Sequence, residues 1–211
     1  MAAVNLSSLD TLSAGKVIQG KFRIVDLLGF SQWGAVYRAV DLSNSSDFDG
    51  SVALKILSAF ADKADEKLAV QTLRKEIRTL TQLRAAETAL NEEEKTEIFS
   101  TPKFYGGSTE LPERFVAQEL MRGKQVSVLL AEAEPDGLAE PAALNMAYQL
   151  FRLLDLLHTQ LQESYVDLKL ENLWWTEPGG RPGEGLLKVT EWTALESLQE
   201  KSHAVKRQYI V

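Results

Sequence analysis

Two glycines and a lysine have the types and order of an anion-binding site. Gly29 and Gly34 stand between two segments in which apolar and polar residues alternate. Glycines at such a turn let backbone N–H groups approach phosphate oxygens closely. Lys55 lies in the apolar run Val52–Leu57, where an unpaired ammonium group would cost free energy through lost hydration. The glycine segment alone is more often an ordinary turn, but with Lys55 it predicts phosphate binding.

Glu76, in the next segment with helical spacing, offers Lys55 an anionic partner. An ion pair between them would satisfy the lysine, and the phosphates of a nucleotide would supply a second anion. The alternative is that Glu76 faces water, as many helical glutamates do.

A second group of chemically capable residues lies near the end of the chain. It reads Tyr165-Val166-Asp167-Leu168-Lys169-Leu170-Glu171-Asn172, and Glu191 follows after a short apolar run. Carboxylate and amide oxygens are the ligands that Mg²⁺ takes in proteins. An Asp-x-Lys-x-x-Asn string by itself is also common in surface loops, so the surrounding sequence has to distinguish a functional site from such a loop.

The elements that position these residues follow from periodicity. Strands are expected at 22–28, 35–42, 51–57, 102–108 and 114–120, and a helix at 62–84 has Leu73, Ile77 and Leu80 on one face. Later helices are expected at 126–133 and at 141–160, the latter with Leu144, Ala147, Phe151 and Leu154 on one face. Short strands are expected at 173–176 and 186–190, and a helix in the tail from residue 194. Turns are expected at 44–50 and 178–183.

This order predicts an α+β fold of two lobes. The first is a five-stranded antiparallel sheet with one helix, and the second is a reduced, mainly helical lobe. We expect an N-terminal extension at residues 1–20, the sheet lobe at 21–122 and the helical lobe at 123–211.

The motifs, taken in order, resemble the catalytic core of Ser/Thr protein kinases, and the resemblance spans about residues 22–193. Gly29-Phe30-Ser31-Gln32-Trp33-Gly34-Ala35-Val36 is similar to the glycine-rich loop, and Val52-Ala53-Leu54-Lys55 to the Val-Ala-Ile-Lys strand. The segment from Tyr165 to Asn172 is similar to the catalytic loop His-Arg-Asp-Leu-Lys-Pro-Glu-Asn. Thr190-Glu191-Trp192-Thr193 stands where the family has Asp-Phe-Gly.

The resemblance implies a role for each matching residue, with ATP and Mg²⁺ as ligands. Asp167 would be the catalytic base, and Lys169 would neutralise charge on the transferred phosphoryl group. Asn172 and Glu191 would bind the metal. The residues implied in nucleotide binding are Gly29, Ser31, Gly34, Val36, Ala53, Lys55, Glu76, Glu119, Met121 and Trp174.

Trp174 would form the floor beneath the adenine, opposite Val36 and Ala53, where a leucine is typical. In the alternative, Trp174 points elsewhere and Trp175 or Leu173 takes that place.

Several departures from the family bear on activity. Glu191 replaces an aspartate, and the extra methylene moves its carboxylate by about 1.5 Å, which octahedral magnesium tolerates poorly. Trp192 would replace the Phe and pack against Tyr165 and the helix that carries Glu76. Thr193 stands where the family has a hinge glycine, and Val166 stands where it has an arginine. Ser31 stands in place of a third glycine, which is a mild change. No Ala-Pro-Glu sequence follows.

Two functions therefore stay open. One is a pseudokinase that acts as a nucleotide-binding or protein-interaction module. The other is an active minimal Ser/Thr kinase with Asp167 as its base. A partner-binding role for the acidic segment Glu87–Glu97 or the Tyr209 tail fits either. Small-molecule kinases of the aminoglycoside type match less well, because their loop lacks the lysine.

Composition narrows the classes of partner and location. The 211 residues carry a net charge of −7 and no cysteine, so nucleic acid is a poor candidate partner and disulfides are excluded. We see no signal peptide and no apolar run long enough to span a membrane. We expect a cytoplasmic protein without a membrane contact, and a protein partner that the sequence does not identify.

Overall fold

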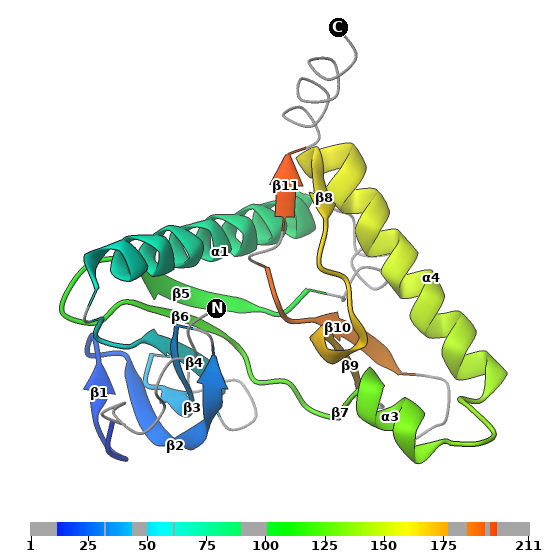
Figure 1. Ribbon diagram of the computed structural model, residues 1–211, viewed down its shortest axis with the longest axis horizontal. Coiled ribbons are helices and arrows are strands. Elements are labelled where there is room, and N and C mark those ends of the chain that lie inside the picture. Colours follow the sequence, from blue (N-terminus) through cyan, green and yellow to red (C-terminus); the bar gives the residue numbers. More distant parts are fainter. Residues whose placement is uncertain are drawn as a thin grey trace, which may run out of the picture. The chain divides into compact units, whose positions relative to one another are not determined.

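The computed structural model describes residues 12–31, 33–43, 50–60, 62–89, 101–176, 185–192 and 195–197, the stretches 87–89 and 195–197 by backbone alone. The chain is a mixed α+β protein with antiparallel sheets (Figure 1). It divides into two compact units. The first is Met1–Leu80 with Lys103–Leu120, and the second is Thr81–Pro102 with Met121–Val211.

The first unit is built on a six-stranded sheet in the order β1-β2-β3-β4-β6-β5. The strands are β1 (Val17–Ile18), β2 (Phe22–Ser31), β3 (Gly34–Asp41), β4 (Ser51–Leu57), β5 (Phe104–Ser108) and β6 (Phe115–Glu119). Five of them match the predicted strands to within a few residues. Within the described residues every neighbouring pair in this sheet is antiparallel.

The sixth strand, β1, was not predicted, because residues 1–20 were expected to form an extension. Its backbone pairs with β2, and the Ile24 N–H donates to the Lys16 carbonyl at 2.9 Å while Gly15 N–H donates to the Ile24 carbonyl at 2.8 Å. The Ile18 side chain is fully buried. Two residues are too short for an alternation signal, so the sequence could not reveal this strand.

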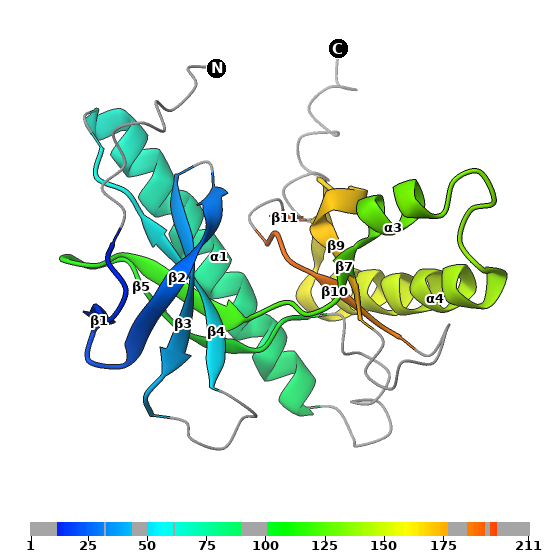
Figure 2. The ribbon, with the colours of Figure 1, turned by 90° about the horizontal axis from the view of Figure 1, so that it is seen from below.

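Alternation along the strands separates the sheet into two faces. One face holds a buried cluster made by Ile18, Phe22, Ile24, Ala35, Tyr37, Ala39, Val52, Leu54, Ile56, Phe115 and Ala117. Lys55 and Val36 are register partners on the opposite face. Helix α1 (Lys63–Ala89) runs along that face (Figures 1 and 2) and buries Ala69, Leu73 and Leu80. It continues past the expected end at residue 84.

The second unit combines helices with short strands. Its elements are β7 (Lys124–Gln125), α3 (Val126–Glu132), α4 (Glu140–Leu156), a π-helical turn (Leu157–Leu161), β8 (Glu163–Tyr165), a 3₁₀ turn (Leu170–Asn172), β9 (Leu173–Thr176), β10 (Leu186–Val189) and β11 (Leu195–Ser197). The strands form a sheet in the order β10-β9-β7 and a separate pair, β11 with β8.

Helix α4 lies beside β10 (Figures 1 and 2). A glutamine determines which face of the helix is turned toward the strand. The Gln149 amide donates to the Gly185 carbonyl and accepts from the Leu187 N–H, both at 2.9 Å. The buried face therefore contains Gln149 and Leu153. The face that the sequence indicated is largely outward, with Leu144 63% and Phe151 69% exposed.

The predicted helix in the tail is wrong where the structure describes it. Residues Leu195–Ser197 form strand β11, which pairs antiparallel with β8, Leu195 opposite Tyr165. A strand edge at β8 offers backbone partners that helical spacing in the sequence does not reveal. The described residues leave out the remaining tail with Tyr209, all but the last residue of the predicted turn at 44–50, the predicted turn at 178–183 and most of the acidic segment.

Among the described residues, no helix has both the length and the apolar character needed to cross a lipid bilayer.

Candidate functional site

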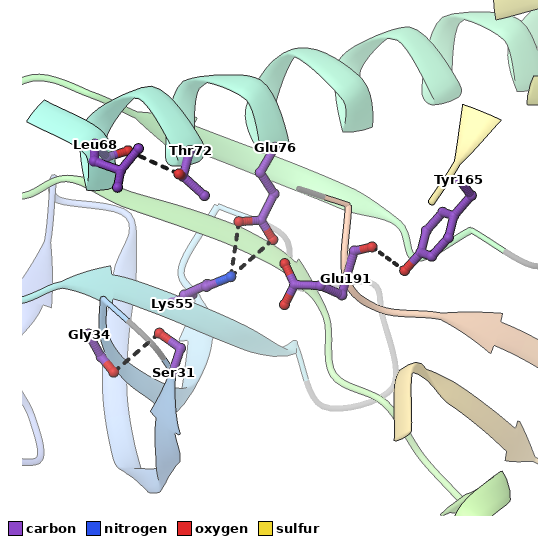
Figure 3. A network of polar contacts seen from close by, with 8 residues as sticks. All are labelled: Ser31, Gly34, Lys55, Leu68, Thr72, Glu76, Tyr165 and Glu191. Atoms are coloured by element: carbon purple, nitrogen blue, oxygen red, sulfur yellow. Dashed lines mark hydrogen bonds and ion pairs between the residues drawn. The ribbon is translucent and has the colours of Figure 1, made fainter. Parts of the chain in front are cut away.

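The β2–β3 hairpin carries the first predicted group. Ser31 and Gly34 are register partners, and the Ser31 hydroxyl donates to the Gly34 carbonyl at 3.2 Å (Figure 3). The Ser58 N–H donates to the Trp33 carbonyl at 3.0 Å, and the rings of Trp33 and Phe60 lie 6.1 Å apart. The turn is therefore tight and tied to the segment that follows β4.

The two glycines of this hairpin differ in what surrounds them. A Cβ added at Gly34 would overlap the Ile56 carbonyl group, so packing of β3 on β4 requires glycine there. A Cβ at Gly29 would meet no heavy atom within 4 Å. Sheet packing thus explains Gly34 and leaves Gly29 as the glycine with open space above its backbone.

Lys55 and Glu76 form the ion pair that the sequence predicted (Figure 3). The Lys55 ammonium lies 3.1 Å from Glu76 Oε2 and 3.4 Å from Oε1. The Glu76 side chain is 1% exposed and that of Lys55 is 16% exposed. A carboxylate buried to this degree is stable only beside a cation, so the pair fixes α1 against β4.

The other predicted nucleotide-binding residues of the first unit lie at the ends of its strands or beside Lys55. Val36 is the register partner of Lys55, and both Val36 and Ala53 are half-buried on the same face. The Glu119 carboxylate accepts from the Lys103 N–H at 3.0 Å, which holds β6 to the start of β5. Met121 is half-buried and belongs to the second unit, as the first residue of its stretch Met121–Val211.

The segment from Asp167 to Asn172 brings the second predicted group together. Lys169 donates to Asp167 Oδ2 at 2.8 Å, and both side chains are about half exposed. The Asn172 amide nitrogen donates to the Asp167 carbonyl at 3.2 Å, and Asn172 itself is 8% exposed. Among the described residues none donates to Asn172 Oδ1. The side-chain amide oxygen Oδ1 is the atom through which Asn172 could bind a cation.

Lys169 sits in a negative environment. Its hydrogen bond with Asp167 raises the pKa of the Lys169 amine above its ordinary value. The charges of Asp167, Glu191 and Glu171 act in the same direction. The amine is therefore held protonated, as a group that faces anions must be.

The backbone carbonyl of Glu191 accepts a hydrogen bond, and the residue that follows it is buried. The Tyr165 hydroxyl donates to the Glu191 carbonyl, and Figure 3 shows the Glu191 carboxylate pointing away from Tyr165. Trp192 is fully buried, and its indole N–H donates to the Val189 carbonyl at 3.0 Å. Its ring meets that of Tyr165 edge to face at 5.7 Å and 89°. The predicted packing of Trp192 on Tyr165 is thus confirmed.

The two tryptophans of β9 take opposite faces of the strand. Trp175 is 4% exposed, and a Cβ at Gly185 would overlap its ring. Leu173 is buried with it, whereas Trp174 is half-buried, at the register position opposite Lys188. Trp175 and Leu173 therefore belong to the core of the second unit, and Trp174 is the less enclosed indole.

The donors predicted for a metal fit a hard cation, since Asp167, Asn172 and Glu191 offer only oxygen atoms. Within the described part of the chain, however, no three His, Cys, Asp or Glu side chains are gathered closely enough to hold a metal ion. Of the three predicted residues only Asp167 and Glu191 carry carboxylates, so the Asn172 amide oxygen would be the third protein ligand of such a cation.

Sequence reasoning missed the residues that connect these parts. The Thr190 N–H and hydroxyl both donate to the Asn172 carbonyl, at 3.0 and 3.3 Å. The Tyr165 hydroxyl bond gave no sequence signal either, because it joins a side chain to a backbone oxygen of another segment.

No known protein-family model matches the chain, and no curated protein sequence matches it.

Proposed function

We propose that the chain is a protein-kinase-like domain that works as a nucleotide-binding or protein-interaction module, with little or no phosphoryl transfer. The observation that carries the proposal is the ion pair of Lys55 and Glu76. It couples a strand lysine to a helix glutamate, and a lysine held in this way is suited to the phosphates of a nucleotide. In this proposal the two units correspond to the two lobes of such a fold.

The chemistry at Glu191 argues for binding over transfer. A glutamate side chain is longer than the aspartate of the family by about 1.5 Å. Its backbone cannot shift freely to compensate, because the Tyr165 hydroxyl and the buried Trp192 hold it. Magnesium requires near-ideal octahedral geometry, so we expect weak metal binding.

The second candidate is an active minimal kinase, and the arrangement around Asp167 favours it. Its carboxylate lies beside the Lys169 ammonium at 2.8 Å, and both are solvent-accessible. There Asp167 would accept the proton of a substrate hydroxyl, and Lys169 would stabilise charge on the phosphoryl group in transit. ATP with a divalent cation would supply the transferable phosphoryl group.

Thermal-shift titration with ATP, with and without Mg²⁺ or Mn²⁺, tests binding. A ligand that binds only the folded chain at about 100 times its Kd adds about 2.7 kcal/mol of stability. We expect a shift for the native chain and a smaller one for Lys55→Met, each measured against that protein's own unliganded midpoint. No shift at millimolar ATP would reject nucleotide binding.

Transfer of labelled γ-phosphate to a protein substrate separates the two candidates. Label incorporated by the native chain and abolished by Asp167→Asn, a variant that still binds ATP, would establish the kinase. We expect no such Asp167-dependent transfer.

A further inference from the structure

Gln118 in β6 has a side-chain amide oxygen for which the fold supplies no donor. Gln118 Oε1 is enclosed, and among the described residues none donates to it. Two other enclosed side-chain atoms in the described part of the chain lack a partner, Arg114 Nε and Arg152 Nε, but each belongs to a guanidinium group with further donors. An enclosed acceptor without a donor costs stability, because the hydration it loses on folding is not replaced. Packing of the first unit therefore does not explain a glutamine at this position.

Gln118 lies on the face of the sheet that carries Lys55. It is the register partner of Ala53, and Val116, two positions earlier in β6, is the register partner of Lys55. Side chains of register partners share one face, and so do those of alternate residues in a strand. Ala117, between the two, belongs to the buried cluster on the other face. The Gln118 side chain therefore extends from the same face as the Lys55 ammonium group and the Ala53 methyl group.

The spacing of the strands sets how far this side chain lies from a phosphate group at Lys55. Two residues of an antiparallel strand span about 6.8 Å, and neighbouring strands lie about 4.8 Å apart. A nucleotide with its phosphates at Lys55 covers the first of these steps with its ribose. Its base then lies against Ala53, within one strand spacing of Gln118. The amino group at C6 of adenine is an N–H donor, which is the group that an amide oxygen requires.

We propose that Gln118 Oε1 accepts a hydrogen bond from the 6-amino group of a bound adenine, and that Gln118 thereby sets the preference of the site for this base. The inference rests on the proposed function, in which Lys55 lies at the phosphates. Turning the Gln118 side chain toward the base breaks no hydrogen bond at Oε1, since the described residues give that atom none. The ligand then supplies the donor that the fold lacks, and the contact offsets the cost of enclosing the amide.

Thermal unfolding without ligand tests whether the amide has a structural task. Gln118→Met removes the amide and keeps a side chain of similar length. Gln149→Met is the matched control, because Gln149 is 7% exposed and its amide bonds both the Gly185 carbonyl and the Leu187 N–H. We expect a midpoint within about 2 °C of the native value, or above it, for Gln118→Met, and a midpoint lower by about 6 °C for Gln149→Met. Equal losses in the two variants would assign the Gln118 amide to the fold and overturn the proposal.

Titration with ATP and with purine riboside triphosphate, which lacks the 6-amino group, tests the contact itself. We expect the ratio of the two affinities to fall about fivefold from the native chain to Gln118→Met, the value for one neutral hydrogen bond. The affinity for purine riboside triphosphate should stay unchanged, whereas a structural role of Gln118 would lower both affinities by the same factor. A native chain that binds ATP with a preference unaltered by Gln118→Met would reject the contact alone. A native chain that binds neither nucleotide would reject the proposed function, and the contact with it.

Discussion

The Lys55 ammonium lies 3.1 Å from the Glu76 carboxylate, and the glutamate is almost completely enclosed. The pair joins β4 to α1 across the face of the sheet that also carries Val36 and Ala53. Because a buried charge without its partner is costly, this relationship makes the sharpest stability prediction for the first unit.

Removing one partner of the pair should destabilise the chain strongly. We expect Lys55→Met to lower the free energy of unfolding by about 3 kcal/mol, since it leaves the Glu76 carboxylate buried without its cation. The double variant Lys55→Met/Glu76→Leu should recover most of that loss. Urea denaturation of the single and double variants measures both values. A double variant no more stable than Lys55→Met would show that the stranded charge is not the cause.

Gly34 and Gly29 should differ strongly in the stability that they lose on substitution by alanine. Gly34→Ala places a methyl group against the Ile56 carbonyl and should cost about 2 kcal/mol of stability. Gly29→Ala meets open space, so its cost should stay within about 0.5 kcal/mol. Thermal unfolding compares the two variants directly. Equal losses would contradict the assignment of Gly34 to sheet packing.

Helix α4 offers a test of which face is buried. Leu153 is 1% exposed and Phe151 is 69% exposed. Leu153→Ala should therefore destabilise the chain by about 3 kcal/mol, whereas Phe151→Ser should change stability by no more than about 0.5 kcal/mol. Denaturant midpoints measured at equal slope give the comparison. The reverse ranking would show that α4 buries the face indicated by the sequence periodicity.

The Lys169 amine should titrate above the ordinary lysine range of about 10.4, because Asp167 raises its pKa. A raised pKa in the folded state stabilises the fold while the amine is protonated. That contribution is complete below the unfolded pKa and is lost as the pH rises through the folded one. Heteronuclear NMR of the labelled lysine side chains should show a lower midpoint for Lys169 in Asp167→Asn. An unchanged midpoint would remove Asp167 as the cause.

Strongly alternating segments made most of the first unit predictable. β4 has the bounds expected from its sequence, and β2, β3, β5 and β6 differ from theirs by a few residues. The pairing of Lys55 with Glu76 was also predictable, because a lysine among apolar residues needs an anionic partner and the resemblance of the sequence to protein kinases indicated Glu76. The sequence could not predict strands that form only by pairing with another segment. Examples are β1, which joins the sheet beside β2, and β11, which pairs with β8.

The buried face of α4 also could not be predicted from the sequence alone. Counting apolar residues favours the stripe with Leu144 and Phe151, whereas the helix buries Gln149 because its amide completes bonds to Gly185 and Leu187. The sequence placed Asp167, Lys169 and Asn172 in one short segment, but it did not predict the hydrogen bonds that join them. The bonds of Tyr165 and Thr190 were not predictable either, because they depend on where another segment returns.

The central claim is that Lys55 lies at the phosphates of a bound nucleotide, and an ATP analogue with an acyl phosphate tests it most directly. Such an analogue transfers its acyl group to a lysine beside the phosphates, and mass spectrometry of the digested chain identifies the labelled residue. The account predicts acylation of Lys55 that excess ATP suppresses, with no such suppression at the exposed Lys63 of α1. A Lys55 that is never labelled, or is labelled equally with and without ATP, would contradict it.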